Sequence, residues 1–302
     1  MSIEIKNVGY TYMKGTPFER RALQNINITI EKGSFTAIAG HTGSGKSTLV
    51  QLMAGLLPLD EGQLLVDGAD LGDRSRQGKQ AAKAARRKVG LVFQSPEHQL
   101  VEETVEKDIS FGPRNLGMGE AEIKARVKNA MKLTGLDYET KKNEDPFRLS
   151  GGQKRRAAIA GVIAMGPKYL ILDEPAAGLD PMGREKFLNQ IKTLHAGGRM
   201  TIILVSHNMD DIARFADKVI VMHQGECLLE DSPEVVFRQK EKLNIAGLQP
   251  PRITMLLETL KSQGLEVPAL AIRMEQGVEE ILRAVNKEKL MLEKGEWTCF
   301  RI

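Results

Sequence analysis

The feature that most constrains the fold of this chain is a glycine-rich run, GHTGSGKST, at residues 40–48, which directly follows the apolar segment SFTAIAG at residues 34–40. The run, called the phosphate loop below, matches the pattern G-x-x-x-x-G-K-S in full. Glycine backbones can curl so that successive amide N–H groups point inward at phosphate oxygens. The helix expected from about Lys46 to Gly55 adds the positive end of its dipole. A flexible Gly/Ser loop is the alternative, but the complete match after a strand favours a strand–loop–helix unit that binds phosphate groups.

The side chains of the phosphate loop extend the same interpretation. Lys46 can reach the β- and γ-phosphates of a nucleotide, Ser47 can ligate magnesium, and Thr48 can help to line the pocket. We therefore predict that a nucleotide triphosphate, with Mg²⁺, binds through the whole loop: Gly40, His41, Thr42, Gly43, Ser44, Gly45, Lys46, Ser47 and Thr48.

A second run, YLILDEP at residues 169–175, is a continuously apolar strand that ends in two carboxylates. This pattern is typical of a central strand that is buried on both faces and carries a site at its carboxyl end. Asp173 is expected to bind magnesium, directly or through water, and Glu174 to accept a proton from the water that attacks the γ-phosphate. An acidic turn that caps a helix is the alternative, and it would be preferred if the phosphate loop were absent.

A third run, LSGGQ at residues 149–153, is called the signature run below. Ser150, Gly151 and Gly152 would place a hydroxyl and unhindered amides at the start of the helix that runs through QKRRAAIAGVIAM, with Gln153 beside them. Such a helix terminus is a second phosphate-binding site. Because one triphosphate is already held by the phosphate loop, the second site is expected to serve a nucleotide on another subunit. An ordinary helix cap is the alternative.

The chain has 302 residues, of which 41% are hydrophobic and 27% are charged, enough for one large globular domain and a smaller appendage. No segment approaches the roughly 18 uninterrupted apolar residues of a membrane span, and the N-terminal residues lack the apolar core of a signal peptide. A cytoplasmic chain is therefore expected. Cys227 and Cys299 lie far apart and are interpreted as ordinary thiols.

The net charge of +4 does not by itself require a nucleic-acid partner, and none is expected. One basic run, RSRQGKQAAKAARRK at residues 74–88, could grip phosphates, but no aromatic residue is interleaved to stack on bases. A solvated loop and helix is the preferred interpretation of this run.

Short apolar strands alternate with amphipathic helices over most of the chain, which predicts an α/β domain with a largely parallel sheet. The strand-like signals stop between about residues 95 and 145, where a helical subdomain is predicted to be inserted; with the signature helix it spans about 95–165. Strands are expected at residues 34–40, 88–93, 169–173, 200–205 and 218–222.

Pro250 and Pro251 break the chain near its C-terminal end, and two amphipathic helices are predicted beyond them. We predict a main domain over residues 1–240 and a helical appendage over 241–302, whose apolar stripes need a partner in the main domain or in another subunit. The stripes comprise Ile253, Leu256, Leu257 and Leu260 in the first helix, and Val278, Ile281, Leu282 and Val285 in the second.

On these three runs the chain resembles the ATP-binding cassette (ABC) ATPases over roughly residues 3–240, since LSGGQ shortly before an apolar strand ending in DE is highly specific to that family. The resemblance implies an ABC-type P-loop fold: a mostly parallel sheet, an inserted helical subdomain and an antiparallel β subdomain. It also implies a head-to-tail dimer in which Lys46 of one subunit and Ser150 of the other sandwich each ATP. The catalytic positions match the family pattern, so hydrolysis is expected to be intact.

Four further positions match family motifs. Gln94 in VFQSPEHQL resembles the Q-loop glutamine, which contacts magnesium, and His207 in LVSHN resembles the switch histidine, which contacts the γ-phosphate; the alternatives are polar residues at strand ends. Asp180 in GLDP resembles the D-loop aspartate at the dimer contact, and a helix N-cap before Pro181 is its alternative. Tyr12 is similar in position to the aromatic residue that stacks on adenine, with Tyr10 as the competing choice.

Further segments look like the ATPases of energy-coupling factor transporters, and most like the second of the two ATPase subunits in such complexes. These segments are TPFERRAL, GHTGSGKST, the continuation SPEHQLVEETV and the helical appendage. The resemblance implies uptake of vitamins or other micronutrients, a second ATPase as partner, a transmembrane coupling protein and small substrate-binding membrane proteins. The chain would then lie on the cytoplasmic face of the cell membrane, with the appendage stabilising the ATPase dimer.

By the same resemblance, Pro96, Glu97 and Gln99 would lie near the groove that receives the coupling protein; an exposed helical turn without a special partner is the alternative. A conventional ABC importer ATPase is the nearest competing function. ABC ATPases that act on DNA or ribosomes are a more distant one, because the chain carries neither a second cassette nor a sustained heptad repeat.

Overall fold

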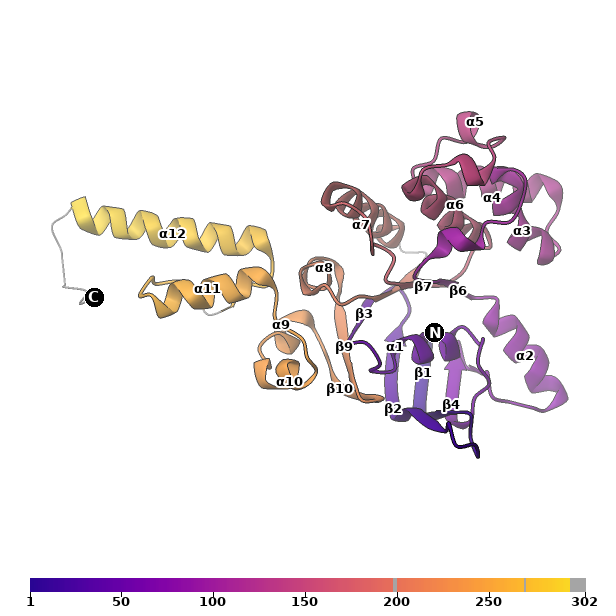
Figure 1. The fold of residues 1–302 in the computed structure, drawn as a ribbon, viewed down its shortest axis with the longest axis horizontal. Helices are drawn as coiled ribbons and strands as arrows, with labels where there is room; N and C mark the ends of the chain where they lie inside the picture. The colour runs from indigo at the N-terminus through magenta and orange to yellow at the C-terminus, as the bar shows by residue number, and fades with distance from the viewer. Residues whose placement is uncertain (198–199, 269, 294–302) are drawn as a thin grey trace.

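The computed structural model describes residues 1–197, 200–268 and 270–293, so Cys299 lies outside the described residues. Two sheets form the main body, and a pair of helices projects from it at the C-terminal end (Figure 1). Within the described residues, no helix is both long and apolar enough to cross a membrane.

The larger sheet has the strand order β10-β9-β3-β8-β7-β6, in which the neighbours from β9 to β6 are parallel and β10 is antiparallel to β9. The strand predictions are confirmed to within a residue or two at each end. Because parallel strands share one carboxyl edge, the loops after β3, β7 and β8 meet there. The strands are β3 (Phe35–Ala39), β6 (Val89–Val92), β7 (Tyr169–Asp173), β8 (Thr201–Val205), β9 (Lys218–His223) and β10 (Glu226–Asp231).

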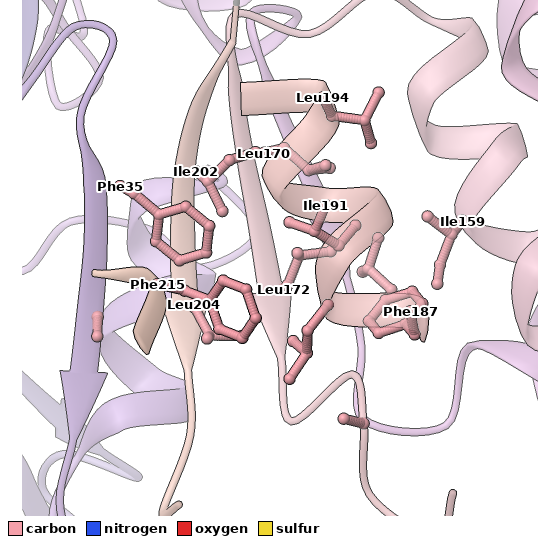
Figure 2. Close-up of a cluster of buried hydrophobic side chains, with 14 of the residues drawn as sticks. Phe35, Ile159, Leu170, Leu172, Phe187, Ile191, Leu194, Ile202, Leu204 and Phe215 are labelled. Atoms are coloured by element: carbon pink, nitrogen blue, oxygen red, sulfur yellow. The ribbon is translucent and has the colours of Figure 1, made fainter. Parts of the chain in front are cut away.

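Alternate residues of the central strands face two different cores. In β7, Leu170 and Leu172 face a core shared with helix α7 (Pro181–Ala196), whereas Tyr169 and Ile171 face the opposite core. Figure 2 shows the first of these cores, in which Leu170 and Leu172 lie between β8 and the inward face of α7. Burial on both faces explains why the strand is apolar throughout.

The smaller sheet is antiparallel, with the order β2-β1-β4-β5. Its inward residues, such as Ile3 and Ile5 of β1 and Ile28 of β2, pack with Leu49 and Leu52 of helix α1 (Lys46–Met53) in the second core. This sheet therefore supports the helix that follows the phosphate loop. Its strands are β1 (Ser2–Tyr12), β2 (Arg20–Glu31), β4 (Glu61–Val66) and β5 (Ala69–Asp70).

Asp67 joins the two sheets from the turn between β4 and β5. Its side chain is 2% exposed and accepts hydrogen bonds from Tyr169 Oη at 2.7 Å and from Lys88 Nζ at 2.8 Å, with Lys168 Nζ at 3.4 Å. Burial alone would raise the pKa of this carboxyl, but the hydrogen bonds from Lys88 and Tyr169 and the Lys88 charge lower it to about 2.

The predicted helical insertion is present, and it is built around α6 (Gly151–Ala164), against which α3 (Val105–Asn115) and α4 (Glu120–Leu133) pack. The first core continues into it through residues such as Ile109, Val127 and Ile159. The remaining elements of the insertion are η1 (Pro96–Gln99), α5 (Tyr138–Lys141) and η2 (Pro146–Arg148).

The basic run forms helix α2 (Arg76–Arg86) and its flanks. Gly78, Ala82 and Ala85 form the buried face of α2, while the basic side chains are exposed, apart from the half-buried Lys88 that pairs with Asp67. The interpretation of this run as a solvated loop and helix is confirmed.

The last helices of the chain divide between the main body and the appendage. Leu243, Ala246 and Leu248 belong to the first core, beyond the predicted boundary at residue 240, and Ile272, just before the last helix, belongs to it as well. Helices α11 and α12 lie side by side (Figure 1) around a small core of their own that contains Leu257 and Ala284. The last helices are α8 (Met209–Phe215), α9 (Pro233–Val236), α10 (Lys240–Ile245), α11 (Arg252–Ser262) and α12 (Met274–Glu293).

Of the predicted apolar stripes, the structure buries part and leaves part exposed. Ile253 and Leu257 are buried and Leu260 and Ile281 are half-buried, while Leu256, Val278, Leu282 and Val285 are exposed. The appendage is also tied to α8, because Asp210 accepts from the Arg252 backbone N–H at 2.9 Å and from Arg252 Nε at 2.5 Å.

Candidate nucleotide-binding and hydrolysis site

The phosphate loop follows β3 and leads into α1, as the sequence predicts. Two of its glycines are required by close packing: a Cβ on Gly40 would lie 2.4 Å from the Met222 carbonyl oxygen, and one on Gly45, with φ +103°, would lie 2.8 Å from the Ala22 carbonyl oxygen. Helix α1 begins without a side-chain cap and without an acidic residue in its first turn. Its positive end is therefore not neutralised by the chain itself, which favours an anion at this position.

Lys46 lies across the mouth of the loop. Its ammonium group donates to the carbonyl oxygens of Gly40 at 2.7 Å and His41 at 2.8 Å, which leaves one of its three N–H donors for another acceptor. Burial lowers the pKa of Lys46, and the nearby carboxylates Glu174 and Asp173 oppose that shift. The ammonium is thus held in place between the loop and the acidic pair.

The two carboxylates lie at the carboxyl end of β7. Burial, and then the neighbouring Glu174, raise the pKa of Asp173, while Lys46 and a hydrogen bond from Ser47 oppose the rise. The Glu174 backbone N–H donates to Val205 O at 3.0 Å, and its carboxylate Oε1 lies 2.8 Å from His207 Nδ1. The Glu174 side chain is 16% exposed and that of His207 is 71% exposed, so the histidine lies on the open side of the site.

Glu174 also has a backbone φ of +48°, in the left-handed region that residues other than glycine, asparagine and aspartate adopt rarely. The strand ends at this residue, and the left-handed turn directs the chain away from the sheet. A strained backbone at a carboxylate beside a phosphate loop is typical of a functional position.

A cavity of about 660 Å³ brings most of the predicted residues together. The structure thus joins at one site residues from the ends of β1 and β7, from the start of α1, and from the loops after β3, β6, β7 and β8. The predicted residues that line this cavity are Tyr12, Thr42, Gly43, Gly45, Lys46, Ser47, Thr48, Gln94, Asp173, Glu174 and His207.

The two candidate tyrosines occupy different environments. Tyr10 is buried beneath the cavity, whereas Tyr12 lines it and its hydroxyl lies 3.2 Å from Thr48 Oγ1. The two rings meet edge to face, with centroids 4.8 Å apart. Of the two, only Tyr12 has a ring positioned to contact a bound base.

Three residues of the predicted loop do not line this cavity. Gly40 is enclosed by neighbouring backbone, and the Ser44 hydroxyl is buried without a hydrogen-bond partner. His41 Nδ1 lies 2.6 Å from Thr42 O, and the His41 ring meets that of His223 at 5.3 Å. Gly40 and His41 instead line a neighbouring cavity of about 1000 Å³, which Lys46, Glu174 and His207 also line.

The signature run lies outside this cavity, at the N-terminus of α6. Ser150 is exposed and caps the helix, with Gln153 N donating to Ser150 Oγ at 3.4 Å and Ser150 N donating to Gln153 Oε1 at 3.0 Å. Gly151 is exposed and Gly152 half-buried. The cap alternative is therefore realised, and because Ser150 and Gly151 are exposed, the phosphate site for a second subunit's nucleotide stays a prediction.

Asp180 is exposed and caps α7, since its carboxylate accepts from Gly183 N at 3.0 Å ahead of Pro181. The N-cap alternative is thus realised in this chain. An exposed aspartate at a helix start remains accessible to a second subunit, so the predicted dimer contact stays a prediction.

The predicted docking turn is the 3₁₀ helix η1, which follows Gln94. Pro96 is buried and Gln99 is exposed. Glu97 is half-buried, and its two carboxylate oxygens each lie 3.4 Å from a guanidinium nitrogen of Arg155.

Five residues that line the cavity were missed at the sequence level: Arg20, Arg21, Ala22, Gln224 and Gly225. A Cβ built on Gly43 would lie 3.6 Å from the Arg20 guanidinium, so this cation is adjacent to the phosphate loop. The basic doublet at the start of β2 was the available signal, but its proximity to the loop depends on how the two sheets pack.

The donor set also fits a magnesium ion. Ser47 offers a hydroxyl, Gln94 an amide oxygen and Asp173 a carboxylate, and hard divalent cations prefer such oxygen ligands. Burial and then the charge of Glu174 raise the pKa of Asp173, and a bound cation would favour its ionised form.

The chain matches known proteins along nearly its whole length. The family model described as ABC transporter matches residues 23–177. The energy-coupling factor transporter ATP-binding protein EcfA2 of Clostridium acetobutylicum is 52% identical over 289 residues, which are 96% of this chain and 100% of that protein.

Solved structures agree with this match. The structure of cbiO1 from Clostridium perfringens, described as part of the ABC transporter complex cbiONQ, is 41% identical with a TM-score of 0.70, covering 85% of this chain and 98% of that one. The dimeric ATP-binding cassette MJ0796 bound to ADP and Pi is 31% identical with a TM-score of 0.67, covering 76% and 98%. The chain therefore belongs to the ABC transporter ATPases and, within them, to the ATP-binding proteins of energy-coupling factor transporters.

Proposed function

We propose that this chain binds and hydrolyses ATP as a subunit of an energy-coupling factor transporter, and that it powers the uptake of vitamins or other micronutrients through a transmembrane coupling protein. The observation that carries this proposal is the likeness along almost the entire chain, including the C-terminal appendage, to ATP-binding proteins of that transporter class. The cavity that gathers Lys46, Asp173, Glu174 and His207 supplies the chemistry.

The roles of the residues follow from their positions. Lys46, with its spare N–H donor, neutralises charge on the β- and γ-phosphates, and His207 faces the γ-phosphate from the open side. The Glu174 carboxylate accepts the proton of the attacking water. Magnesium, held by Ser47, Gln94 and Asp173, would neutralise phosphate charge when it is bound.

The remaining site residues act in adenine binding and in assembly. Tyr12 stacks on the adenine ring. Asp180 and the signature residues Ser150, Gly151, Gly152 and Gln153 meet a second ATPase subunit, with the signature run contacting the ATP held by that subunit's phosphate loop. In this proposal the partner is a different ATPase, and the pair lies peripherally on the cytoplasmic face of the membrane with the coupling protein and small substrate-binding membrane proteins.

The test is affinity purification of the tagged Glu174→Gln chain from gently solubilised native membranes in the presence of ATP, followed by identification of the proteins that accompany it. A matched sample carries Lys46→Ala in addition, which weakens ATP binding and controls for contacts that do not depend on nucleotide. A second, different ATPase together with a polytopic membrane protein and small membrane proteins is the expected result. Self-pairing on a dedicated permease would indicate a conventional importer, and recovery with ribosomes or DNA would overturn a transport function.

A further inference from the structure

Arg155 is a buried cation directly behind the signature run. It lies in the second turn of α6 and is 8% exposed, and among the described residues it is the only buried lysine or arginine. Burial of an unpaired charge is costly, so such a side chain is retained only with well-placed partners. The hydrogen-bond partners of Arg155 therefore show which segments of the chain its side chain fixes in place.

The guanidinium joins three segments that are distant in sequence. Its Nη1 donates to the carbonyl oxygens of Pro175 at 3.2 Å and Ala177 at 2.5 Å, and its Nε and Nη2 face the two carboxylate oxygens of Glu97 at 3.4 Å. Hydrogen bonds from a cation to carbonyl groups are stronger than those between neutral groups. Arg155 thus fixes the turn immediately after β7 and connects it to η1.

That turn sets the direction of Glu174. The φ of +48° at Glu174 is strained, and a strained backbone persists only where its surroundings over-determine it. The Glu174 N–H is fixed by Val205 O and its carboxylate by His207, while the peptide groups that follow it are fixed by Arg155. Without the guanidinium, two carbonyl groups of the turn lose these hydrogen bonds, and the backbone on the C-terminal side of Glu174 is released.

We propose that Arg155 is a positioning residue for ATP hydrolysis: it holds the Pro175–Ala177 turn so that the Glu174 carboxylate faces the phosphate loop, and its pair with Glu97 makes this hold depend on the position of η1. The inference rests on the proposed role of Glu174 as the base. Arg155 does not line the cavity, so its effect reaches the reaction through the backbone segments that it holds. If η1 moved relative to α6, Glu97 would pull the Arg155 guanidinium with it and weaken the hydrogen bonds that hold the turn.

The test compares Arg155→Gln with the parent in the ATPase assembly purified through a tag on this chain. Phosphate release is measured over a range of ATP concentrations, so that kcat and KM separate. Because a small misplacement of a catalytic group costs on the order of ten- to a hundredfold in rate, kcat is expected to fall by that factor while KM for ATP changes less than about twofold. Arg155→Lys keeps the positive charge but lacks the planar guanidinium with its several N–H donors. Its kcat is therefore expected to lie between those of the parent and Arg155→Gln.

Arg126→Gln is the matched control. Arg126 lies in the same helical subdomain, pairs with Glu122 at 2.8 Å and approaches a backbone carbonyl, that of Ala164, at 3.5 Å, but it does not contact the turn after Glu174. Its kcat is expected to equal that of the parent. An equal loss in both variants, or a parallel loss of ATP binding in Arg155→Gln, would reduce Arg155 to a structural residue and overturn the inference.

The pair with Glu97 has its own test. Glu97→Gln is expected to lower kcat less than Arg155→Gln does, and the double variant is expected to match Arg155→Gln alone, because one contact carries both effects. Strictly additive effects would overturn the connection to η1. If Glu174→Gln keeps its turnover, the proposed base is wrong; if Glu174→Gln is inactive and Arg155→Gln is normal, the positioning role alone fails.

Discussion

Glu174 combines the features that a general base for water attack needs. Its carboxylate lies beside the phosphate loop, accepts from a histidine on the open side, and is attached to a backbone fixed from both directions. These contacts restrict the side chain without neutralising it, because His207 and the backbone groups leave its second oxygen free to accept a proton.

Glu174→Gln keeps the size of the side chain and removes its basicity. The expected result is a loss of turnover on the order of a hundredfold or more, the usual contribution of a general base, with ATP binding retained. Phosphate release and equilibrium ATP binding, measured on the same preparation, check both halves of this expectation. Near-normal phosphate release would show that another group accepts the proton.

Tyr12 makes two separable contributions, a ring that faces the cavity and a hydroxyl next to Thr48. Stacking of a base on an aromatic ring is worth about 1–3 kcal/mol, so Tyr12→Ala is expected to weaken ATP binding by that amount. Tyr12→Phe keeps the ring and is expected to bind ATP nearly as the parent does. Titration with ATP and with inorganic triphosphate gives the decisive comparison, because triphosphate lacks the base and its affinity should not respond to either change.

The candidate site could be predicted well where a residue's role depends on its own segment. The phosphate loop and the pair Asp173–Glu174 are each contiguous in sequence, so their chemistry could be predicted from the sequence alone. The structure brings them together at one cavity. Arg155 could not be found in this way. Its partners lie 58 and 20–22 residues away and include two carbonyl groups, which carry no side-chain signal.

At the scale of the elements, the strands of the parallel sheet were predictable because they are buried on both faces and read as continuous apolar runs. The strands of the antiparallel sheet alternate between buried and exposed residues, and no range was predicted for them individually. The apolar face of α12 was predicted from its periodicity, but periodicity alone could not show that Val278, Leu282 and Val285 are exposed in the folded chain.

The turn that contains Asp67 contributes stability that depends on pH. The carboxyl has a pKa of about 2 in the folded chain against an ordinary value of 3.8, so its contribution, about 2 kcal/mol, is fully present above pH 4 and is lost as the pH falls through 2. Asp67→Asn removes the charge while tolerating the φ of +51° at this position. The variant is expected to be less stable at pH 7 by about this amount.

Denaturant unfolding of parent and Asp67→Asn between pH 7 and pH 2 provides the measurement. The difference in unfolding free energy between the two chains should shrink as the pH falls below 4. Asp231→Asn serves as the comparison, because Asp231 is an exposed carboxylate at the end of β10. A difference between parent and Asp67→Asn that stays constant with pH would contradict the charge-based account.

For the whole molecule, the packing of the first core defines where the main body ends. Leu243, Ala246 and Leu248 lie in that core, as does Ile272 between α11 and α12, whereas the two helices themselves surround a separate one. A chain that ends at Gln249 loses only Ile272 from the buried members of the first core and is therefore expected to fold and bind ATP. A chain that ends at Lys240 loses two buried leucines at about 1.5–3 kcal/mol each and should be less stable by about 3–6 kcal/mol.

Unfolding of the two shortened chains in urea, with ATP binding as the check of the native fold, compares them directly. The chain that ends at Gln249 is the control for removal of the appendage itself. Equal stability of the two would place the boundary at residue 240, as the sequence indicates.

The hydrogen bond between Asp67 and Tyr169 has one more consequence, for the alignment of β7 with its neighbours. Since both faces of β7 are buried, sliding the strand by one residue would exchange one set of leucine and isoleucine side chains for another and change the buried apolar area little. The same slip would turn the side chains of Asp173 and Glu174 each to the face opposite to the one they now occupy. The Tyr169 hydroxyl at the start of the strand donates to Asp67 at 2.7 Å, so it favours one of the registers that the apolar pattern leaves open, and with it the side on which the carboxylate of Glu174 emerges.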